Sequence, residues 1–186
     1  KTEYLNIILD ETNKMNKLVM DLLNLSQLES GSVDIEWKDF EIRNLIEDTA
    51  NLFNLVIKDK GIRLTTKIKD HLIHSDYAHL QTVLTNFINN AINHVDGKKV
   101  IDISVETAKD GVIKVVVFNT GMQIPDDEIK NIWDSFYKID KARTRSYGGQ
   151  GLGLSICRTT LDLLDYKYGV ENRVDGVAFY FEIKTF

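Results

Sequence analysis

The chain has 186 residues, of which 43% are hydrophobic, and it carries a formal net charge of −5. This length accommodates one domain of about 150 residues with an extra element, and such a domain buries a core without disulfide support. A mildly acidic surface of mixed charge argues against a nucleic-acid partner. The single cysteine, Cys157, excludes an internal disulfide and is expected to be a buried small hydrophobe.

The N-terminal stretch contains no glycine or proline before Gly31 and predicts one long helix. Ile8, Met15 and Leu22 recur every seven residues, which is the spacing of a coiled-coil seam. No capping residue marks a start, so we expect the helix to begin upstream of residue 1. Because its apolar stripe needs a partner, we expect residues 1–31 to form half of an antiparallel hairpin in a dimeric bundle.

From residue 33 onward the pattern changes to short strands and helices. Strands are predicted at 33–42, 63–68, 72–74, 100–106, 112–118, 168–172 and 177–184. Helices are predicted at 43–60, at 154–165 and from an N-cap at Ser75 or Asp76 to about residue 94. Together these elements predict an α+β fold, a two-layer sandwich with a mixed, largely antiparallel sheet and helices on one face, preceded by the long helix.

A segment of about 35 residues between Asn119 and Gly153 interrupts this domain and holds the only proline and five of the glycines. Its end, Gly149-Gln150-Gly151-Leu152-Gly153, directly precedes an apolar helix. Glycines let backbone amides approach a ligand, and a helix N-terminus attracts anions. The segment therefore predicts a phosphate site, although a glycine-rich hinge would have the same pattern.

Two asparagines, Asn86 and Asn90, lie four residues apart on the helix that ends near residue 94 and therefore share one face. Their amide oxygens are neutral ligands for a hard cation such as Mg²⁺. The alternative interpretation is that they cap a neighbouring loop.

A third group of residues follows the strand that ends near residue 118. Asn119 and the turn at Gly121 can present one hydrogen-bonding group to the floor of a pocket, and Phe136 and Tyr137 add aromatic surface. A basic run then follows, with Lys138, Lys141, Arg143 and Arg145. We expect this segment to be a mobile lid over phosphates; the alternative is a solvated charged surface.

The order of these motifs resembles the catalytic domain of sensor histidine kinases, which shares its ATP-binding fold with gyrase, heat-shock chaperones and mismatch-repair ATPases. Residues 136–156 are similar to the family's phenylalanine box and second glycine box. Residues 22–31 resemble the end of the second helix of the dimerisation hairpin. The resemblance covers nearly the whole chain, and it implies a partial hairpin at 1–31 and an ATP-binding catalytic domain at 33–186.

Carried over by position, the resemblance implies that Asn90 binds Mg²⁺ and that Asn86 supports the metal and the ATP phosphates. Asn119 would accept from the adenine amine, and Gly121 would form the turn beside it. Phe136 and Tyr137 would anchor the lid. The phosphates would be lined by Gly149, Gly151, Leu152, Gly153 and Leu154, and the γ-phosphate would be contacted by Lys138, Arg143 or Arg145.

Three positions depart from the family's pattern. Asn119 stands where Asp is usual, Gln123 where a second glycine is usual, and Asn93 where Lys is frequent. These departures leave open an alternative function, a catalytically degenerate nucleotide-binding module whose role is interaction. Asn86 stands where the gyrase-like relatives have a glutamate that activates water. Because an amide is not a general base at neutral pH, we expect phosphoryl transfer rather than rapid hydrolysis.

The family's phospho-accepting histidine is followed by an acid and then a proline, and no histidine here has this context. We expect the four histidines to be structural: His71, His74, His79 and His94. The resemblance implies transfer of the phosphoryl group to a histidine outside this chain and then to a response-regulator receiver domain. It also implies a homodimer through the hairpin. We expect a cytoplasmic domain whose parent is anchored in the cell membrane through segments not present here.

Overall fold

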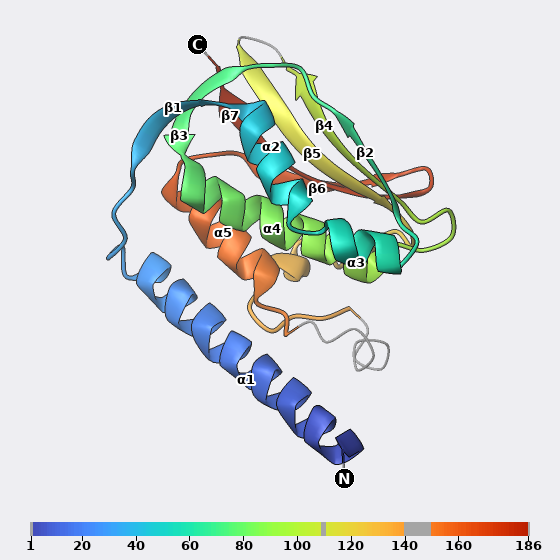
Figure 1. Ribbon diagram of the computed structural model, residues 1–186. Coiled ribbons are helices and arrows are strands. Elements are labelled where there is room, and N and C mark those ends of the chain that lie inside the picture. The colour runs from blue at the N-terminus through green and yellow to red at the C-terminus, as the bar shows by residue number, and fades with distance from the viewer. Residues whose placement is uncertain (1, 109–110, 140–149, 186) are drawn as a thin grey trace.

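The structure is a computed structural model that describes residues 2–108, 111–139 and 150–185. The chain begins with a long helix and continues into a domain of alternating strands and helices (Figure 1). In chain order the elements are α1 (Thr2–Glu29), β1 (Trp37–Glu41), α2 (Ile42–Asn51), α3 (Asn54–Asp59), β2 (Arg63–Lys67), β3 (Leu72–Asp76), α4 (Tyr77–His94), β4 (Val100–Thr107), β5 (Val112–Thr120), η1 (Asn131–Trp133), α5 (Gly153–Leu163), β6 (Tyr168–Arg173) and β7 (Gly176–Lys184).

The main sheet has five strands in the order β2-β4-β5-β7-β6. The β2 and β4 strands are parallel, whereas the other neighbours are antiparallel. Helices α2, α4 and α5 lie over one face of this sheet (Figure 1). The predicted α+β fold with a mixed, largely antiparallel sheet is therefore confirmed. The predicted strand at 72–74 forms as β3, but it pairs with β1 in a separate two-stranded sheet.

Two predicted elements differ from the structure. The prediction of a single helix at 43–60 is wrong, because the chain turns between α2 and α3 and forms two helices. There the N–H groups of Leu52 and Phe53 donate to carbonyls three residues back, and the ring of Phe53 enters the core. The strand predicted from residue 33 begins only at Trp37, since no pairing with β3 precedes that residue among the described residues.

The start of α4 is fixed by the carboxylate of Asp76, as the capping pattern predicts. The backbone N–H of His79 donates to Oδ1 at 2.9 Å, and the backbone N–H of Glu36 donates to Oδ2 at 2.7 Å. Burial alone would raise the pKa of Asp76, but these two hydrogen bonds together hold that pKa below its usual value. One carboxylate thus joins α4 to the segment that follows α1.

The main core lies between the five-stranded sheet and the helices. Phe87 on α4, Phe179 on β7 and Trp133 on η1 meet at its centre, with ring centroids 5.6 Å to 6.5 Å apart. Cys157 is fully buried in this core, as predicted. Trp133 is therefore a core residue.

A second, smaller core joins α1 to α5. Leu25 and Leu28 on α1 pack against Leu152 and Ile156. Leu18, earlier on α1, is only partly buried against this cluster, and Ile8, Met15 and Leu22 of the predicted seam are 60%, 67% and 39% exposed. The apolar stripe of this helix is therefore open to a partner over most of its length. No helix in the described part of the chain is long and apolar enough to cross a membrane.

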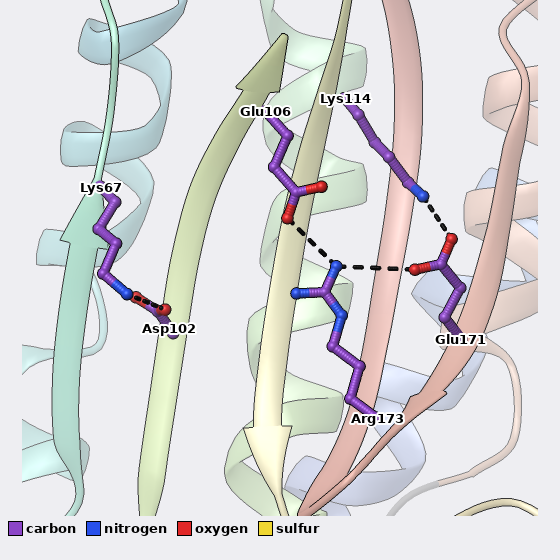
Figure 2. A network of polar contacts seen from close by, with 6 residues as sticks. All are labelled: Lys67, Asp102, Glu106, Lys114, Glu171 and Arg173. Carbon is purple, nitrogen blue, oxygen red and sulfur yellow. Dashed lines mark hydrogen bonds and ion pairs between the residues drawn. The ribbon is translucent and has the colours of Figure 1, made fainter. Parts of the chain in front are cut away.

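The other face of the sheet carries a network of charged side chains (Figure 2). Arg173 on β6 lies 3.2 Å from Glu106 and 3.6 Å from Glu171, which also pairs with Lys114 on β5. The Lys114 ammonium lies 3.6 Å from the centre of the Tyr180 ring. Hydrogen bonding from Lys114 is the main cause that holds the pKa of Glu171 below its usual value. The network thus links β4, β5 and β6 through their side chains.

Candidate functional site

The first contact of the candidate site joins α4 to the start of α5. The Asn86 side-chain nitrogen Nδ2 donates to the Thr82 carbonyl at 3.0 Å, so the amide is oriented by its own helix. A Cβ built on Gly153 would lie 2.9 Å from Asn86 Oδ1. Because real Cβ atoms essentially never approach so closely, any side chain at position 153 would require the Asn86 amide to shift. The structure therefore brings together two residues predicted for the phosphate end of the site.

Asn90 lies one turn further along α4 and is half-buried. Its amide forms no hydrogen bond with another described residue, unlike that of Asn86. The alternative interpretation, in which both amides cap a neighbouring loop, receives no support from these contacts. The free amide oxygen of Asn90 fits a hard cation, which accepts neutral oxygen ligands together with phosphate oxygens and water.

The far end of α4 meets the turn that follows β5. Gly121 has a φ of 151°, and a Cβ there would lie 2.5 Å from the carbonyl oxygen of His94. The turn can therefore pass this close to α4 only because residue 121 has no side chain. Asn119, at the end of β5, is 2% exposed, and its Nδ2 donates to the Thr120 carbonyl at 3.2 Å.

Thr120 fixes this turn, a role that sequence analysis missed. Its hydroxyl donates to the carbonyl of Asp96 at 2.9 Å and accepts from the backbone N–H of Val100 at 3.0 Å. The Asp96 N–H in turn donates to the Thr120 carbonyl at 2.9 Å. An open hollow of about 390 Å³ lies beside this turn. Its lining contains neither Asn86 nor Asn90, so the hollow adjoins the turn end of the site.

The segment after Gly121 is tied to β6 by side-chain amides. Gln123 donates to the Arg173 carbonyl at 2.8 Å. Asn172 accepts from the N–H of Ile124 at 2.9 Å and donates to its carbonyl at 2.7 Å. Gln123, which departs from the glycine of the related pattern, thus anchors the turn through its side chain. Sequence analysis had no signal for Asn172, because a single asparagine in a strand gives none.

The two ends of the predicted lid meet at Phe136 and Gly151. The Phe136 N–H donates to the Gly151 carbonyl at 2.8 Å. A Cβ on Gly151, whose φ is 77°, would lie 2.9 Å from backbone atoms of Phe136. Phe136 itself has a φ of 65° and is 56% exposed, so a strained backbone holds an aromatic ring at the surface. Tyr137 packs against the main core.

The helix that follows the glycine-rich segment begins at Gly153. No side chain caps its N-terminus and no acidic residue lies in its first turn, so the backbone N–H groups there are available to an anion. Leu154 packs against the main core. The side chain of Leu152 is buried against α1, so its predicted contact with the nucleotide would come from its backbone.

Arg143, Arg145 and Gly149 lie outside the described residues, as does Lys141. Lys138 precedes this gap and is half-buried. Two of the histidines are held in contacts of the fold. His74 lies 2.6 Å from Asp39 through Nδ1 and stacks on Trp37, and His79 follows the capping carboxylate of Asp76.

The described contacts line up along one helix. Asn86 meets the glycine-rich segment, Asn90 follows, and His94 meets the turn at Gly121. With a rise of 1.5 Å per residue, Asn86 and His94 lie about 12 Å apart along α4. The start of α5, which attracts anions, lies at one end of this span, and the buried side chain of Asn119 lies near the other. Binding of a nucleoside polyphosphate requires such a separation.

Comparison with known proteins agrees with this geometry. The family model described as histidine kinase-, DNA gyrase B- and HSP90-like ATPase matches residues 75–185. The chain therefore belongs to this family of ATPases. Within the family, it is the ATP-binding catalytic domain of a sensor histidine kinase, as its relatives indicate.

Two curated relatives illustrate the likeness. The chain is 26% identical to the autoinducer 2 sensor kinase/phosphatase LuxQ of Vibrio vulnificus (strain CMCP6) over 88% of its own length and 20% of LuxQ. It is 29% identical to the sensor histidine kinase YclK of Bacillus subtilis (strain 168) over 88% of its length and 34% of YclK. The chain thus spans about a third of YclK and a fifth of LuxQ.

Solved structures of histidine kinase ThkA show the same fold. The ThkA catalytic domain matches with a TM-score of 0.71 and 30% identity, covering 80% of this chain and 95% of that one. ThkA in complex with the response regulator protein TrrA matches with a TM-score of 0.78 and 28% identity, covering 98% of this chain and 51% of that one.

Proposed function

We propose that this chain binds Mg²⁺·ATP between α4 and the glycine-rich segment and transfers the γ-phosphoryl group to a histidine on another segment or chain. The observation that carries the proposal is the close approach of the Asn86 side chain on α4 to Gly153 at the start of α5. The free amide of Asn90 and the uncapped start of α5 support it.

Each end of the nucleotide would meet a different set of residues. Asn90 would hold Mg²⁺, which supplies neutralisation of phosphate charge when bound. Asn86 and the backbone of Gly151 and Gly153 would orient the phosphates. Asn119 would accept from the adenine amine beside Gly121. Phe136 and Tyr137 would anchor the lid, with Gly149 at its far end and Lys138, Arg143 or Arg145 reaching the γ-phosphate.

Catalysis in this arrangement would come from positioning and charge neutralisation, as phosphoryl transfer generally requires. Asn86 cannot accept a proton at neutral pH, so it would not activate water for hydrolysis. Neither would His74 or His79 serve as the acceptor, because each imidazole lies beside a carboxylate of the fold, that of His74 at 2.6 Å from Asp39 and that of His79 at 2.9 Å from Asp76. The acceptor histidine would then pass the phosphoryl group to the receiver domain of a response regulator.

We also propose that residues 1–31 are the second helix of a dimerisation hairpin and that residues 33–186 are the catalytic domain. The exposed stripe of α1 supports a helical partner, and homodimerisation through that hairpin is the arrangement we expect. The domain would lie in the cytoplasm, in a parent anchored to the membrane through other segments.

Calorimetric titration with a non-hydrolysable ATP analogue and Mg²⁺ tests the proposal. Wild type should bind in the micromolar range, and Asn90→Ala should abolish Mg²⁺-dependent binding. Asn89→Ala is the matched control, because residue 89 lies about 100° around the helix from residue 90 and should leave affinity unchanged. A wild type that binds no nucleotide would refute the kinase function and favour an interaction module, as the departures at Asn119, Gln123 and Asn93 suggest.

A further inference from the structure

Helix α1 contacts the catalytic domain along one stripe of its surface (Figure 1). Leu25 and Leu28 are buried against the start of α5, Leu18 is partly buried there, and the carbonyl of Lys14 accepts from Gln150. At about 100° per residue, these four α1 positions lie within an arc of about 80°. We call this arc the docking stripe.

The docking stripe is a different face of α1 from the exposed seam. Ile8, Met15 and Leu22 of the seam are centred about 100° further round the helix. A partner helix packed on the seam would therefore leave the docking stripe uncovered. The contact between α1 and the glycine-rich segment can form and release while α1 remains in a helical bundle.

One acidic side chain lies within the docking stripe. Asp21 follows Leu18 by three residues and precedes Leu25 by four, which places it in the same arc, and it is half-buried. It forms no hydrogen bond with another described residue. The opposing segment from residue 150 to residue 157 contains no charged residue, and Lys17 on α1 is the cation that acts on the carboxylate. Burial therefore raises the pKa of Asp21.

We propose that α1 is a reversible latch on the glycine-rich segment and that the carboxylate of Asp21 keeps this latch weak. An ionised group at an apolar contact loses water on docking, and the charge of Lys17 offsets part of that loss. An uncharged side chain at position 21 would not oppose docking in this way. Asp21 thus sets the equilibrium between a docked and a released α1.

The latch has a consequence for nucleotide binding, which rests on the proposed function. Leu152 lies against α1, whereas Gly153, the next residue, lies against Asn86. Docking therefore orders the backbone that would meet the phosphates, and ordering before binding raises affinity. The Asp21 carboxylate also repels phosphate groups at the start of α5. Both effects predict that loss of this charge tightens nucleotide binding.

The experiment measures hydrogen exchange of the amides of residues 18–28 in the full chain, because protein helices are stabilised mainly by packing. Asp21→Asn should raise their protection about threefold, and Asp21→Leu, which makes the docking stripe more apolar, about tenfold. Glu29→Gln is the matched control, because it removes the same charge from an exposed position of the same helix. Its protection should equal that of wild type.

The pH dependence gives an independent measurement. The docked pKa of Asp21 lies above 3.8, so its ionised form opposes docking at neutral pH, and this opposition is lost as pH falls through the docked pKa. The ratio of protection between Asp21→Asn and wild type should therefore fall toward one on acidification. Protection in Asp21→Asn at or below the wild-type value would overturn the proposal, as would an equal rise in Glu29→Gln.

Calorimetry with the imido analogue of ATP and Mg²⁺ tests the link to the nucleotide. Asp21→Asn should bind about threefold more tightly than wild type, and the gain should shrink in about 1 M salt, which screens the repulsion. Unchanged affinity would overturn the coupling between the latch and the nucleotide site. Failure of wild type to bind the analogue would instead refute the nucleotide-binding function, and the exchange measurements would still decide whether α1 is a latch.

Discussion

The side-chain nitrogen of Gln150 donates to the backbone carbonyl of Lys14 at 2.5 Å, across 136 residues of sequence. This hydrogen bond connects the start of the glycine-rich segment to the middle of α1. Together with the burial of Leu152 against Leu25 and Leu28, it makes the position of α1 and the position of that segment depend on each other.

Gln150→Ala should loosen the glycine-rich segment from α1 without unfolding the domain. The expected loss is about 1 kcal/mol, the value of one hydrogen bond, in the local opening free energy. Native-state hydrogen exchange should therefore become faster at residues 151–153 and remain unchanged in β5. Gln123→Ala is a comparable control, because it removes a side-chain hydrogen bond to a different carbonyl. Equal acceleration in both variants would contradict a specific role for Gln150.

Gly153→Ala should weaken nucleotide binding through Asn86. The new methyl group would lie 2.9 Å from Asn86 Oδ1 and push that amide out of place. We expect at least a tenfold loss of Mg²⁺·ATP affinity by calorimetry, whereas helix propensity predicts up to about 1 kcal/mol of added stability. In the double variant Asn86→Ala, Gly153→Ala the clash is absent, so its affinity should equal that of Asn86→Ala. Additive losses would show that the two residues act independently.

Asp76→Asn should destabilise the protein at neutral pH. The amide nitrogen cannot accept from a second backbone N–H, so one of the two hydrogen bonds is lost and a donor faces a donor, at a cost of about 1–3 kcal/mol. The folded-state pKa of Asp76 lies below 3.8, so its contribution is complete above that value and is lost as pH falls through the folded pKa. Urea unfolding at pH 7 and pH 3 should show the two proteins converging at the lower pH.

The stability of the protein at alkaline pH should depend on Tyr77. Burial, together with the hydrogen bond that its hydroxyl donates to Asp48 at 2.6 Å, raises its pKa to about 12. Because the unfolded phenol ionises near 10, the contribution of Tyr77 is present below that pH and is lost between pH 10 and 12. Tyr77→Phe keeps the edge contact with Phe40 and should flatten this part of the stability curve, measured by urea unfolding. An unchanged pH dependence of the unfolding free energy in Tyr77→Phe would contradict this role of Tyr77.

Lys114→Ala should lower the free energy of unfolding by more than the loss of an ordinary surface ion pair does. The Lys114 side chain is 17% exposed, and its ammonium contacts the Glu171 carboxylate (Figure 2) and the Tyr180 ring, so we expect the free energy of unfolding to fall by about 1–2 kcal/mol in urea unfolding. Lys98→Ala breaks a pair with Asp175 that is more than half exposed, and it should cost about 0.5 kcal/mol or less. A similar loss of unfolding free energy in the two variants would mean that the network around Lys114 adds little to stability.

Local patterns in the sequence predicted most of the fold. The alternation of Ile101, Ile103 and Val105 marks a strand with one buried face, and the Asp76 carboxylate caps the helix that the pattern places after it. The break at Phe53 was not predictable, because its ring could continue a helical stripe as well as end it. Only contact with the core decides between these two outcomes.

The candidate site was predictable where a residue type is unusual for its element. Paired asparagines within a helix and glycines before one are such signals, and Asn86 does meet Gly153 in the structure. Thr120 and Asn172 were missed because threonine and asparagine are common near strand ends. Their importance comes from partners 20 to 48 residues away, which no short window of sequence contains.

The separation of the two hydrophobic cores has a consequence for unfolding. Among the α1 side chains that the structure describes, only Leu25 and Leu28 are buried, and they contact the start of α5 rather than the sheet. Since cooperativity depends on shared buried contacts, α1 should leave the protein at lower denaturant concentration than the sheet. The melting curve of this chain alone would then show two transitions, and the first would disappear once a partner helix covers the exposed stripe of α1.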